Sequence, residues 1–321
     1  MEYTILGKTG LKVSVAGLGC GGFSGIGKGT GKSESESVSI VRQALDLGVN
    51  LIDTAAAYGT ESIVGRAIEG YDRDTVVLST KASVGKMDNL RSPRQVVESL
   101  EQSLRVLGVD CIDVFHLHGV PPNAYDYACE ELVPALLREQ ESGKFKFLGI
   151  TEIPPDDAGH ETLVRAVRTD CFQVVMVAYH MLHQSARRSI FPVTIEKGIG
   201  VLGMFAVRVL FSEPGRLKRV VEDLSEEGRL PDGARGEGGE PLAFLIHDTG
   251  ARSVIDAAYR YCRHSDGPDV VLFGTGNPEH LKANVESILS PPLPEADVDR
   301  LEALFGMLTD VGLDAPGRVK G

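Results

Sequence analysis

Four polar side chains with complementary chemistry follow apolar runs of the sequence. Asp53 and Tyr58 belong to the stretch NLIDTAAAYG, Lys81 ends the run VVLSTK, and His118 ends the run IDVFHLH. A tyrosine has a pKa of about 10 and donates a proton poorly at neutral pH, but a nearby lysine cation favours the phenolate and lowers that pKa. An aspartate beside the lysine would keep the partly buried cation paired. A histidine could orient a carbonyl oxygen or relay a proton.

These side chains could together polarise a carbonyl group, but none of them can supply a hydride. A nicotinamide cofactor, NADP or NAD, is therefore implied. A single charged residue at the end of a strand is usually a solvated loop residue, whereas these four residue types at neighbouring strand ends indicate a site. A Schiff base between Lys81 and a carbonyl substrate is a second possible chemistry, although the Asp53–Tyr58 motif argues against it.

Short apolar runs alternate with longer amphipathic stretches, which is typical of strands followed by helices. The expected strands cover 13–19, 50–53, 75–81, 111–118, 147–151, 172–178, 200–205 and 270–274. Helices are expected at 37–47, 60–69, 93–107, 129–140, 157–168, 187–197, 252–262, 277–289 and 296–309. This alternation predicts an α/β fold, a closed (β/α)8 TIM barrel, in which active sites lie at the carboxyl ends of the strands. A doubly wound open sheet is the alternative, but it would need a helix directly after the first glycine-rich turn.

Two segments lie outside this alternation. Residues 3–13 are typical of a β-hairpin with its turn at 7–10. Residues 208–240 are charged and rich in glycine, and we expect them to form an insertion over the barrel mouth after the seventh strand. A short helix is expected within it at 217–224. We expect residues 1–321 to form a single barrel domain.

The composition argues against several kinds of partner. The formal net charge of −12 at pH 7 argues against nucleic acid and against an anionic membrane surface. No apolar run approaches the roughly 20 residues that span a bilayer, and the N-terminus lacks the pattern of a signal peptide. The five cysteines are scattered without a CxxC pair, which favours reduced thiols in a cytoplasmic protein over a disulfide or zinc framework. We therefore expect a small-molecule substrate and no metal site, and the oligomeric state is not indicated.

Several separate motifs resemble those of the aldo-keto reductase family, in the same order and spacing. They are the opening segment MEYTILGKTGLKVSVAGLGCGGF, the stretch NLIDTAAAYG, the strand end LSTK, the strand IDVFHLH and the segment FGTGNPEHLKAN. The resemblance covers residues 1–290. It implies a barrel that binds NADP or NAD without a Rossmann fold. It also implies an oxidoreductase that interconverts a carbonyl compound (an aldehyde, ketone or sugar) and an alcohol.

The resemblance also implies roles for individual residues. Tyr58 would be the general acid or base, Lys81 would tune it, Asp53 would pair with Lys81, and His118 would orient the substrate carbonyl. His116, two residues earlier on the same strand, is the alternative to His118. The implied cofactor contacts are Gly19, Cys20, Gly21, Asp53, Thr151, Glu152, Met204, Phe205, Gly274, Thr275, Gly276, His280 and Asn284.

Some of these positions depart from the family pattern. Thr151 and Glu152 stand where the family usually has a Ser-Asn pair at the nicotinamide carboxamide, and Met176 replaces the usual glutamine. Met204 or Phe205 would have to replace the aromatic residue that stacks on the nicotinamide.

The cofactor preference and the turnover are left open by the sequence. His280 occupies the position of an arginine that commonly grips the 2′-phosphate of NADP, and a dianionic phosphate prefers Arg or Lys. NADP and NAD therefore both remain candidates. The alternative to an enzyme is a regulatory protein that keeps the barrel and the cofactor but performs little chemistry.

Overall fold

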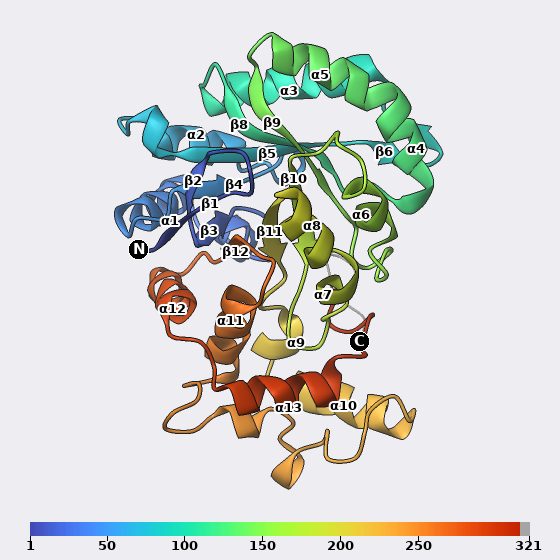
Figure 1. Cartoon of the computed structure of the whole chain (residues 1–321). Helices are drawn as coiled ribbons and strands as arrows, with labels where there is room; N and C mark the ends of the chain where they lie inside the picture. Colours follow the sequence, from blue (N-terminus) through green and yellow to red (C-terminus); the bar gives the residue numbers. More distant parts are fainter. Residues whose placement is uncertain (315–321) are drawn as a thin grey trace.

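A closed barrel of eight parallel strands forms the centre of the computed structural model, which describes residues 1–314 (Figure 1). The barrel strands are β3 (Ala16–Gly19), β4 (Leu51–Asp53), β5 (Val77–Ser83), β8 (Ile112–His118), β9 (Phe145–Thr151), β10 (Val174–Ala178), β11 (Gly200–Met204) and β12 (Val270–Phe273). Each strand pairs with the next barrel strand along the chain, and β12 closes the barrel by pairing with β3. The predicted (β/α)8 barrel is confirmed, and the alternative of an open sheet is wrong.

Helices surround the barrel and connect its strands (Figure 1). They include α1 (Glu34–Asp46), α2 (Glu61–Ile68), α3 (Pro93–Leu107), α6 (Glu161–Ala166), α7 (Ala186–Ser189), α8 (Phe191–Lys197), α11 (Val254–His264) and α12 (Pro278–Leu289). The bounds of α3 match the sequence prediction because both ends carry local signals. Ser92 accepts a hydrogen bond from the Gln95 backbone N–H at the start, and Gly108 adopts a left-handed φ of 69° at the end.

The helix predicted at 129–140 is longer and less regular than expected. It consists of α4 (Tyr125–Tyr127), a π-helical turn at Ala128–Leu132 and α5 (Val133–Glu141). Pro134 has no N–H, so it cannot donate a backbone hydrogen bond within a continuous α-helix. The widened π-helical turn lies directly before it, where the regular pattern of hydrogen bonds is interrupted.

The N-terminal hairpin closes one end of the barrel. Strands β1 (Tyr3–Ile5) and β2 (Lys12–Ser14) pair antiparallel, as the sequence predicts. Leu6 and Val13 are fully buried and belong to the apolar cluster inside the barrel. The other buried members of this cluster are Leu51, Val77, Val114, Val174, Met176, Leu202, Val270 and Leu272. Gly7 has a φ of +50°, and a Cβ there would lie 2.3 Å from the backbone nitrogen of Gly200, so the turn fits only without a side chain.

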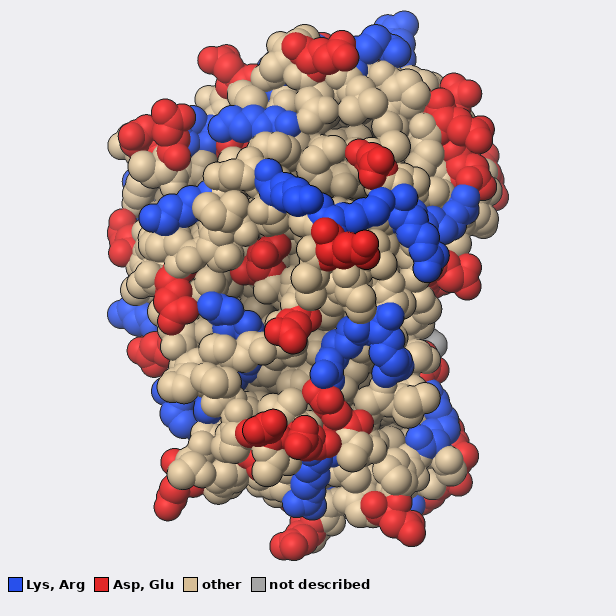
Figure 2. Space-filling model, in the orientation of Figure 1, with Lys and Arg blue, Asp and Glu red and all other residues tan. Residues whose placement is uncertain are grey.

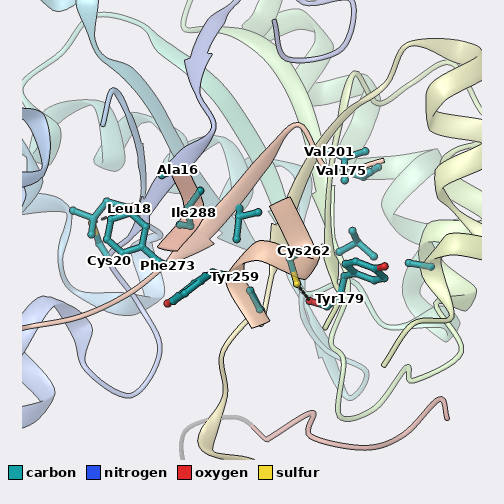
Figure 3. Packing of buried hydrophobic residues seen from close by; sticks show 14 of the residues in the cluster. Ala16, Leu18, Cys20, Val175, Tyr179, Val201, Tyr259, Cys262, Phe273 and Ile288 are labelled. Carbon is teal, nitrogen blue, oxygen red and sulfur yellow. Dashed lines mark hydrogen bonds between the residues drawn. The ribbon is translucent and has the colours of Figure 1, made fainter. Parts of the chain in front are cut away.

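A second apolar layer lies between the strands and the surrounding helices. Figure 3 shows Leu18 and Phe273 of the barrel beside Ile288, and Tyr179 beside Cys262 of α11. The Cys262 thiol donates a hydrogen bond to the Tyr179 carbonyl at 3.4 Å. This layer fixes α11 and α12 against the barrel, close to the strand ends that carry the predicted site.

The predicted insertion follows β11. It contains α9 (Val209–Ser212) and α10 (Arg216–Glu226), the second of which is the short helix that the sequence predicts. Beyond α10, Arg229 forms an ion pair with Asp310, which follows α13 (Glu295–Phe305). Figure 1 shows α10 and α13 together at one end of the molecule. The later part of the insertion is thus tied to the C-terminal segment.

A short hairpin after β5 is not anticipated by the sequence. Strands β6 (Gly85–Lys86) and β7 (Asn89–Leu90) pair antiparallel. Two residues per strand are too few for an alternating apolar pattern, so no periodic signal exists. Gly85, the first residue of β6, has a φ of +93°, a conformation that favours glycine.

The surface carries both signs of charge. On the face drawn in Figure 2, Lys and Arg side chains are interspersed with Asp and Glu. A band of Lys and Arg side chains crosses the upper half of this face, with Asp and Glu side chains beside it. Within residues 1–314, none of the helices has the length and apolar character needed to cross a bilayer.

The hairpin should contribute strongly to stability. We expect Leu6→Ala to lower the free energy of unfolding by about 2–5 kcal/mol, because it leaves a cavity in the closed end of the barrel. Ile195→Ala is a matched control on α8, where the side chain is 60% exposed, and it should change stability by less than about 0.5 kcal/mol. Urea unfolding of both variants checks this expectation, and equal effects would contradict it.

Candidate active site

A buried ion pair lies at the carboxyl ends of β4 and β5. The Lys81 ammonium donates to both Asp53 carboxylate oxygens, at 2.7 and 2.6 Å, and to the Thr54 carbonyl at 2.7 Å. The Lys81 side chain is fully buried, and Asp53 is 3% exposed. The two strands are neighbours, and Asp53 lies opposite Ser79 in their register. Parallel pairing therefore brings these charges together, as the sequence predicts.

The ion pair continues into the barrel through two further side chains. The Ser79 hydroxyl donates to Asp53 Oδ1 at 2.6 Å, and His116 Nε2 lies 3.1 Å from the same hydroxyl oxygen. His116 thus lies behind the ion pair, deeper than His118. Burial, followed by the charge of Lys81, lowers the pKa of His116 well below its usual value. Ser79 is not among the predicted site residues, although its position two residues before Lys81 places both side chains on one side of the strand.

Tyr58 lies beside this ion pair on the short helical turn Ala56–Tyr58. The Lys81 ammonium is 5.1 Å from the centroid of the Tyr58 ring. The Tyr58 hydroxyl is 3.4 Å from His118 Nε2, and the two rings meet edge to face. A Cβ at Gly21 would lie 2.5 Å from the Tyr58 ring, so this glycine makes room for it. The four residues predicted to be catalytic are thus brought together.

Burial and charge act in opposite directions on Tyr58. Burial raises the pKa of Tyr58, the charge of Lys81 lowers it, and the charge of Asp53 raises it further. The net shift of the Tyr58 pKa is upward, whereas the sequence alone predicts only the lowering by lysine. Burial alone would lower the pKa of Lys81, but Asp53 and Tyr58 outweigh it, so the pKa of Lys81 is raised. The arrangement therefore holds a protonated tyrosine beside a lysine cation.

A cavity of about 760 Å³ extends from Tyr58 to α12. Ten of the residues with predicted roles line it: Gly19, Gly21, Asp53, Tyr58, Met204, Phe205, Gly274, Thr275, His280 and Asn284. Met176 lines it as well. Its volume falls within the range of about 300–1,000 Å³ that is typical of small-molecule sites. Glycines in its wall allow a ligand to approach the backbone closely, so the residues present fit an extended dinucleotide.

Two other residues of the predicted cofactor set serve as packing positions. Cys20 is fully buried, and burial raises the pKa of its thiol, which makes it inert. A Cβ at Gly276 would lie 2.3 Å from the backbone of Gly27, so this glycine permits contact with the loop after β3.

Thr151 and Glu152 are engaged elsewhere. The Thr151 hydroxyl accepts from the Gly119 N–H at 2.7 Å. Glu152 accepts from the Ala178 N–H at 2.7 Å and lies 2.8 Å from His160 Nδ1, and neither it nor Thr151 is among the described residues that line the cavity. The side-chain oxygens of Thr151 and Glu152 thus already have hydrogen-bond partners within the protein. The contact of these two residues with the nicotinamide stays a prediction.

The Glu152–His160 contact is buried on both sides. Burial raises the pKa of Glu152 more than the charge of His160 lowers it, so the net shift is upward. Burial lowers the pKa of His160, but the charge of Glu152 outweighs this and raises it. His160 Nε2 also lies 2.9 Å from the Ser185 hydroxyl. The contact links the end of β9 to the start of α6 and to the segment after β10.

The far end of the cavity contains a paired arginine. Arg252 Nη2 lies 2.9 Å from Asp256 Oδ1, and its Nη1 lies 4.0 Å from Glu286. At the start of α12, the Asn277 side chain accepts from the backbone N–H groups of Glu279 and His280. These donors at the helix terminus are therefore already bonded.

His118 should remain neutral over the whole working range of pH. Burial, followed by the charge of Lys81, lowers the pKa of His118 to about 3. Imidazole ¹⁵N shifts, assigned by comparison with His118→Gln, should therefore stay constant from about pH 8 to pH 5, whereas an unperturbed imidazole titrates at about 6.5. A His118 titration midpoint close to the unperturbed value would contradict this expectation.

Curated relatives match most of the chain. Aldo-keto reductase YhdN from Bacillus subtilis is 28% identical over 300 residues, which are 88% of this chain and 87% of that protein. L-galactose dehydrogenase from Arabidopsis thaliana is 30% identical over 208 residues, which are 63% of this chain and 64% of that protein.

Solved structures and a family model agree with these relatives. The holo form of aldo-keto reductase AKR11C1 from Bacillus halodurans has a TM-score of 0.74 and 23% identity, over 98% of this chain and 100% of that chain. This likeness establishes the barrel fold. The model of the Aldo/keto reductase family matches residues 17–305, from the first barrel strand to α13. The chain therefore belongs to the aldo/keto reductase family.

Proposed function

We propose that this protein is an NAD(P)-dependent oxidoreductase that interconverts a carbonyl compound and an alcohol, with Tyr58 as the general acid or base. The observation that carries the proposal is the position of the Tyr58 hydroxyl. It lies 3.4 Å from His118 Nε2, beside the Lys81–Asp53 ion pair and at one end of the long cavity. A general acid must reach the oxygen that it protonates, and this hydroxyl faces the space where a substrate would bind.

The chain's own residues would perform the proton transfer. A bound nicotinamide cofactor supplies the hydride. Tyr58 would donate its proton to the substrate oxygen, and the Lys81 cation would stabilise the resulting phenolate. His118, in its neutral form, would hold the carbonyl oxygen beside Tyr58. Asp53 would keep Lys81 charged and fixed in place.

The geometry argues against a Schiff base on Lys81. A lysine nucleophile must lose its proton, which requires a lowered pKa. The pKa of Lys81 is raised, and its ammonium already donates to Asp53 and to the Thr54 carbonyl. Lys81 is therefore better suited to act as a fixed positive charge.

We propose a class of carbonyl substrates and not a single compound. The two curated relatives are named as an aldo-keto reductase and an L-galactose dehydrogenase. These names support an aldehyde, ketone or sugar as the carbonyl partner. The acidic charge and scattered cysteines support a cytoplasmic location as part of the same proposal.

Tyr58→Phe tests the mechanism. Because the variant lacks the proton donor but keeps the ring, we expect kcat to fall by at least about 100-fold, the lower end of the range for general acid catalysis. Cofactor affinity, measured by fluorescence titration, should stay within about twofold, because the lost hydroxyl is one small contact among many.

Tyr71→Phe is the matched control, because it removes a hydroxyl that bonds to Asp46 on the surface. Its turnover should equal that of the wild type. Unchanged activity of Tyr58→Phe would refute the mechanism. A wild-type protein that binds cofactor but shows no multiple turnover on aldehydes, ketones and sugars would instead favour the alternative of a regulatory protein.

We expect NADH to bind more tightly than NADPH, by about tenfold, or about 1.4 kcal/mol. At the far end of the cavity Arg252 is already near Asp256 and Glu286, and the N–H groups of Glu279 and His280 are already bonded, so a 2′-phosphate there would meet few free donors. Glu286→Gln should narrow the difference by removing a repelling charge, whereas Glu98→Gln on α3 should not. Parallel titrations with NADH and NADPH measure the ratio of the two dissociation constants. Tighter binding of NADPH would contradict the expected preference.

A further inference from the structure

His116 is a polar side chain within the interior of the barrel. It is fully buried, and its ring lies against Gly149 of β9, where a Cβ would come within 2.2 Å of Nδ1. This Nδ1 has no hydrogen-bond partner among residues 1–314. A buried polar atom without a partner is unfavourable, so an apolar side chain would serve better for packing alone. The histidine is therefore better explained by the hydrogen bond that its other nitrogen makes.

That bond determines which ring nitrogen carries the proton. His116 Nε2 lies 3.1 Å from the hydroxyl oxygen of Ser79, which is also fully buried and donates to Asp53 Oδ1 at 2.6 Å. A carboxylate only accepts, so the Ser79 proton points to Asp53 and the Ser79 oxygen accepts from His116. Since its pKa lies well below the usual value, the imidazole is neutral and holds one proton. That proton must be on Nε2, and Nδ1 is the unprotonated nitrogen beside Gly149.

This tautomer directs the Ser79 hydroxyl. A hydroxyl proton rotates to suit its neighbours, so an unprotonated Nε2 would compete with Asp53 for it, whereas a protonated Nε2 does not. The residues come from the neighbouring strands β4, β5 and β8, whose register places Asp53 opposite Ser79 and Lys81 opposite His116. The closed barrel thus holds both donors behind the carboxylate.

The Asp53 carboxylate would be less well fixed without this support. The terminal torsion of an aspartate is broad, so a carboxylate can rotate about it at low cost. Lys81 contacts both oxygens, whereas the Ser79 bond selects Oδ1. The Lys81 ammonium lies 5.1 Å from the centroid of the Tyr58 ring, and its charge opposes the rise in the Tyr58 pKa that burial causes. A rotated carboxylate would therefore displace the cation from its place beside the tyrosine.

We propose that Ser79 and His116 are positioning residues for the reaction: the His116 Nε2–H group orients the Ser79 hydroxyl, and that hydroxyl fixes the carboxylate that holds Lys81. This inference rests on the proposed function. Neither Ser79 nor His116 is among the described residues that line the cavity. The two residues should therefore influence kcat and leave the binding of substrate and cofactor unchanged.

Three single variants and one double variant of the full chain test the proposal. His116→Leu replaces the ring with an apolar side chain, and His116→Gln keeps an N–H donor. Ser79→Ala removes the hydroxyl, and the double variant combines Ser79→Ala with His116→Leu. Ser103→Ala is the matched control, because Ser103 of α3 is fully buried and its hydroxyl has no hydrogen-bond partner among residues 1–314. Steady-state kinetics use the aldehyde, ketone or sugar that the wild type turns over fastest.

We expect kcat to fall by about 10- to 100-fold in His116→Leu and in Ser79→Ala, because a displacement of about 1 Å at the reacting centre can cost about 100-fold. KM and the dissociation constant of the cofactor should stay within about twofold. The double variant should be no slower than Ser79→Ala, because His116 acts through Ser79. His116→Gln should recover most of the lost kcat, and Ser103→Ala should match the wild type.

A second measurement is independent of turnover. Imidazole ¹⁵N shifts distinguish a protonated from an unprotonated ring nitrogen, and the His116 signals are assigned by comparison with His116→Gln. In the wild type at neutral pH, His116 should be protonated at Nε2 and unprotonated at Nδ1.

Several results would overturn this inference alone. They are unchanged kcat in Ser79→Ala, a raised KM at unchanged kcat, additive losses in the double variant, or a wild-type His116 ring protonated at Nδ1. If His116→Leu fails to fold, Ser79→Ala and His116→Gln carry the test. A wild-type chain that turns over none of the carbonyl compounds would overturn the inference together with the proposed function.

Discussion

The buried ion pair of Lys81 and Asp53 is the interaction on which the site depends. Removing two charges from water is unfavourable unless good geometry and further hydrogen bonds compensate. Here Asp53 also accepts from Ser79, and Lys81 also donates to the Thr54 carbonyl, so the pair is well satisfied. All four residues lie on or directly after β4 and β5, whose register is fixed by the closed barrel. The barrel therefore stabilises a charge arrangement that a flexible loop could not maintain.

One lysine charge then influences the protonation of both of its neighbours. Burial raises the pKa of Tyr58, and Lys81 opposes this without overcoming it, so the hydroxyl keeps its proton. Burial and Lys81 act in the same direction on His118 and lower its pKa, so the imidazole stays neutral. A protonated tyrosine beside a neutral histidine suits the donation of a proton to a carbonyl oxygen. In the opposite direction Tyr58 must first lose its proton, and the nearby cation makes that phenolate less unfavourable.

The sequence is sufficient where a local pattern determines the structure. Asp53, Lys81 and His118 each end an apolar run, and the alternation of strands and helices places those ends together at one face of the barrel. Glu152 shows the opposite case: its partners are His160 and the Ala178 N–H, which come from separate segments and leave no signal in its own surroundings. Two nitrogens of the Arg208 guanidinium, Nε and Nη2, have no hydrogen-bond partner among residues 1–314, and this is equally invisible in the sequence. The sequence alone therefore does not predict which side chains of separate loops contact each other.

The charge of the whole chain and the charge of the cavity act on different kinds of anion. A net charge of −12 disfavours an extended polyanion, which would contact many surface charges at once. A small anion inside a cavity interacts mainly with nearby groups, since solvent-exposed charges more than about 8–10 Å away are largely screened by physiological salt. In this cavity Asp53 is neutralised by Lys81 and Asp256 by Arg252, which leaves Glu286 and Arg208 as the other charged side chains of the wall. The charges of the cavity wall are therefore close to balanced, unlike those of the chain as a whole.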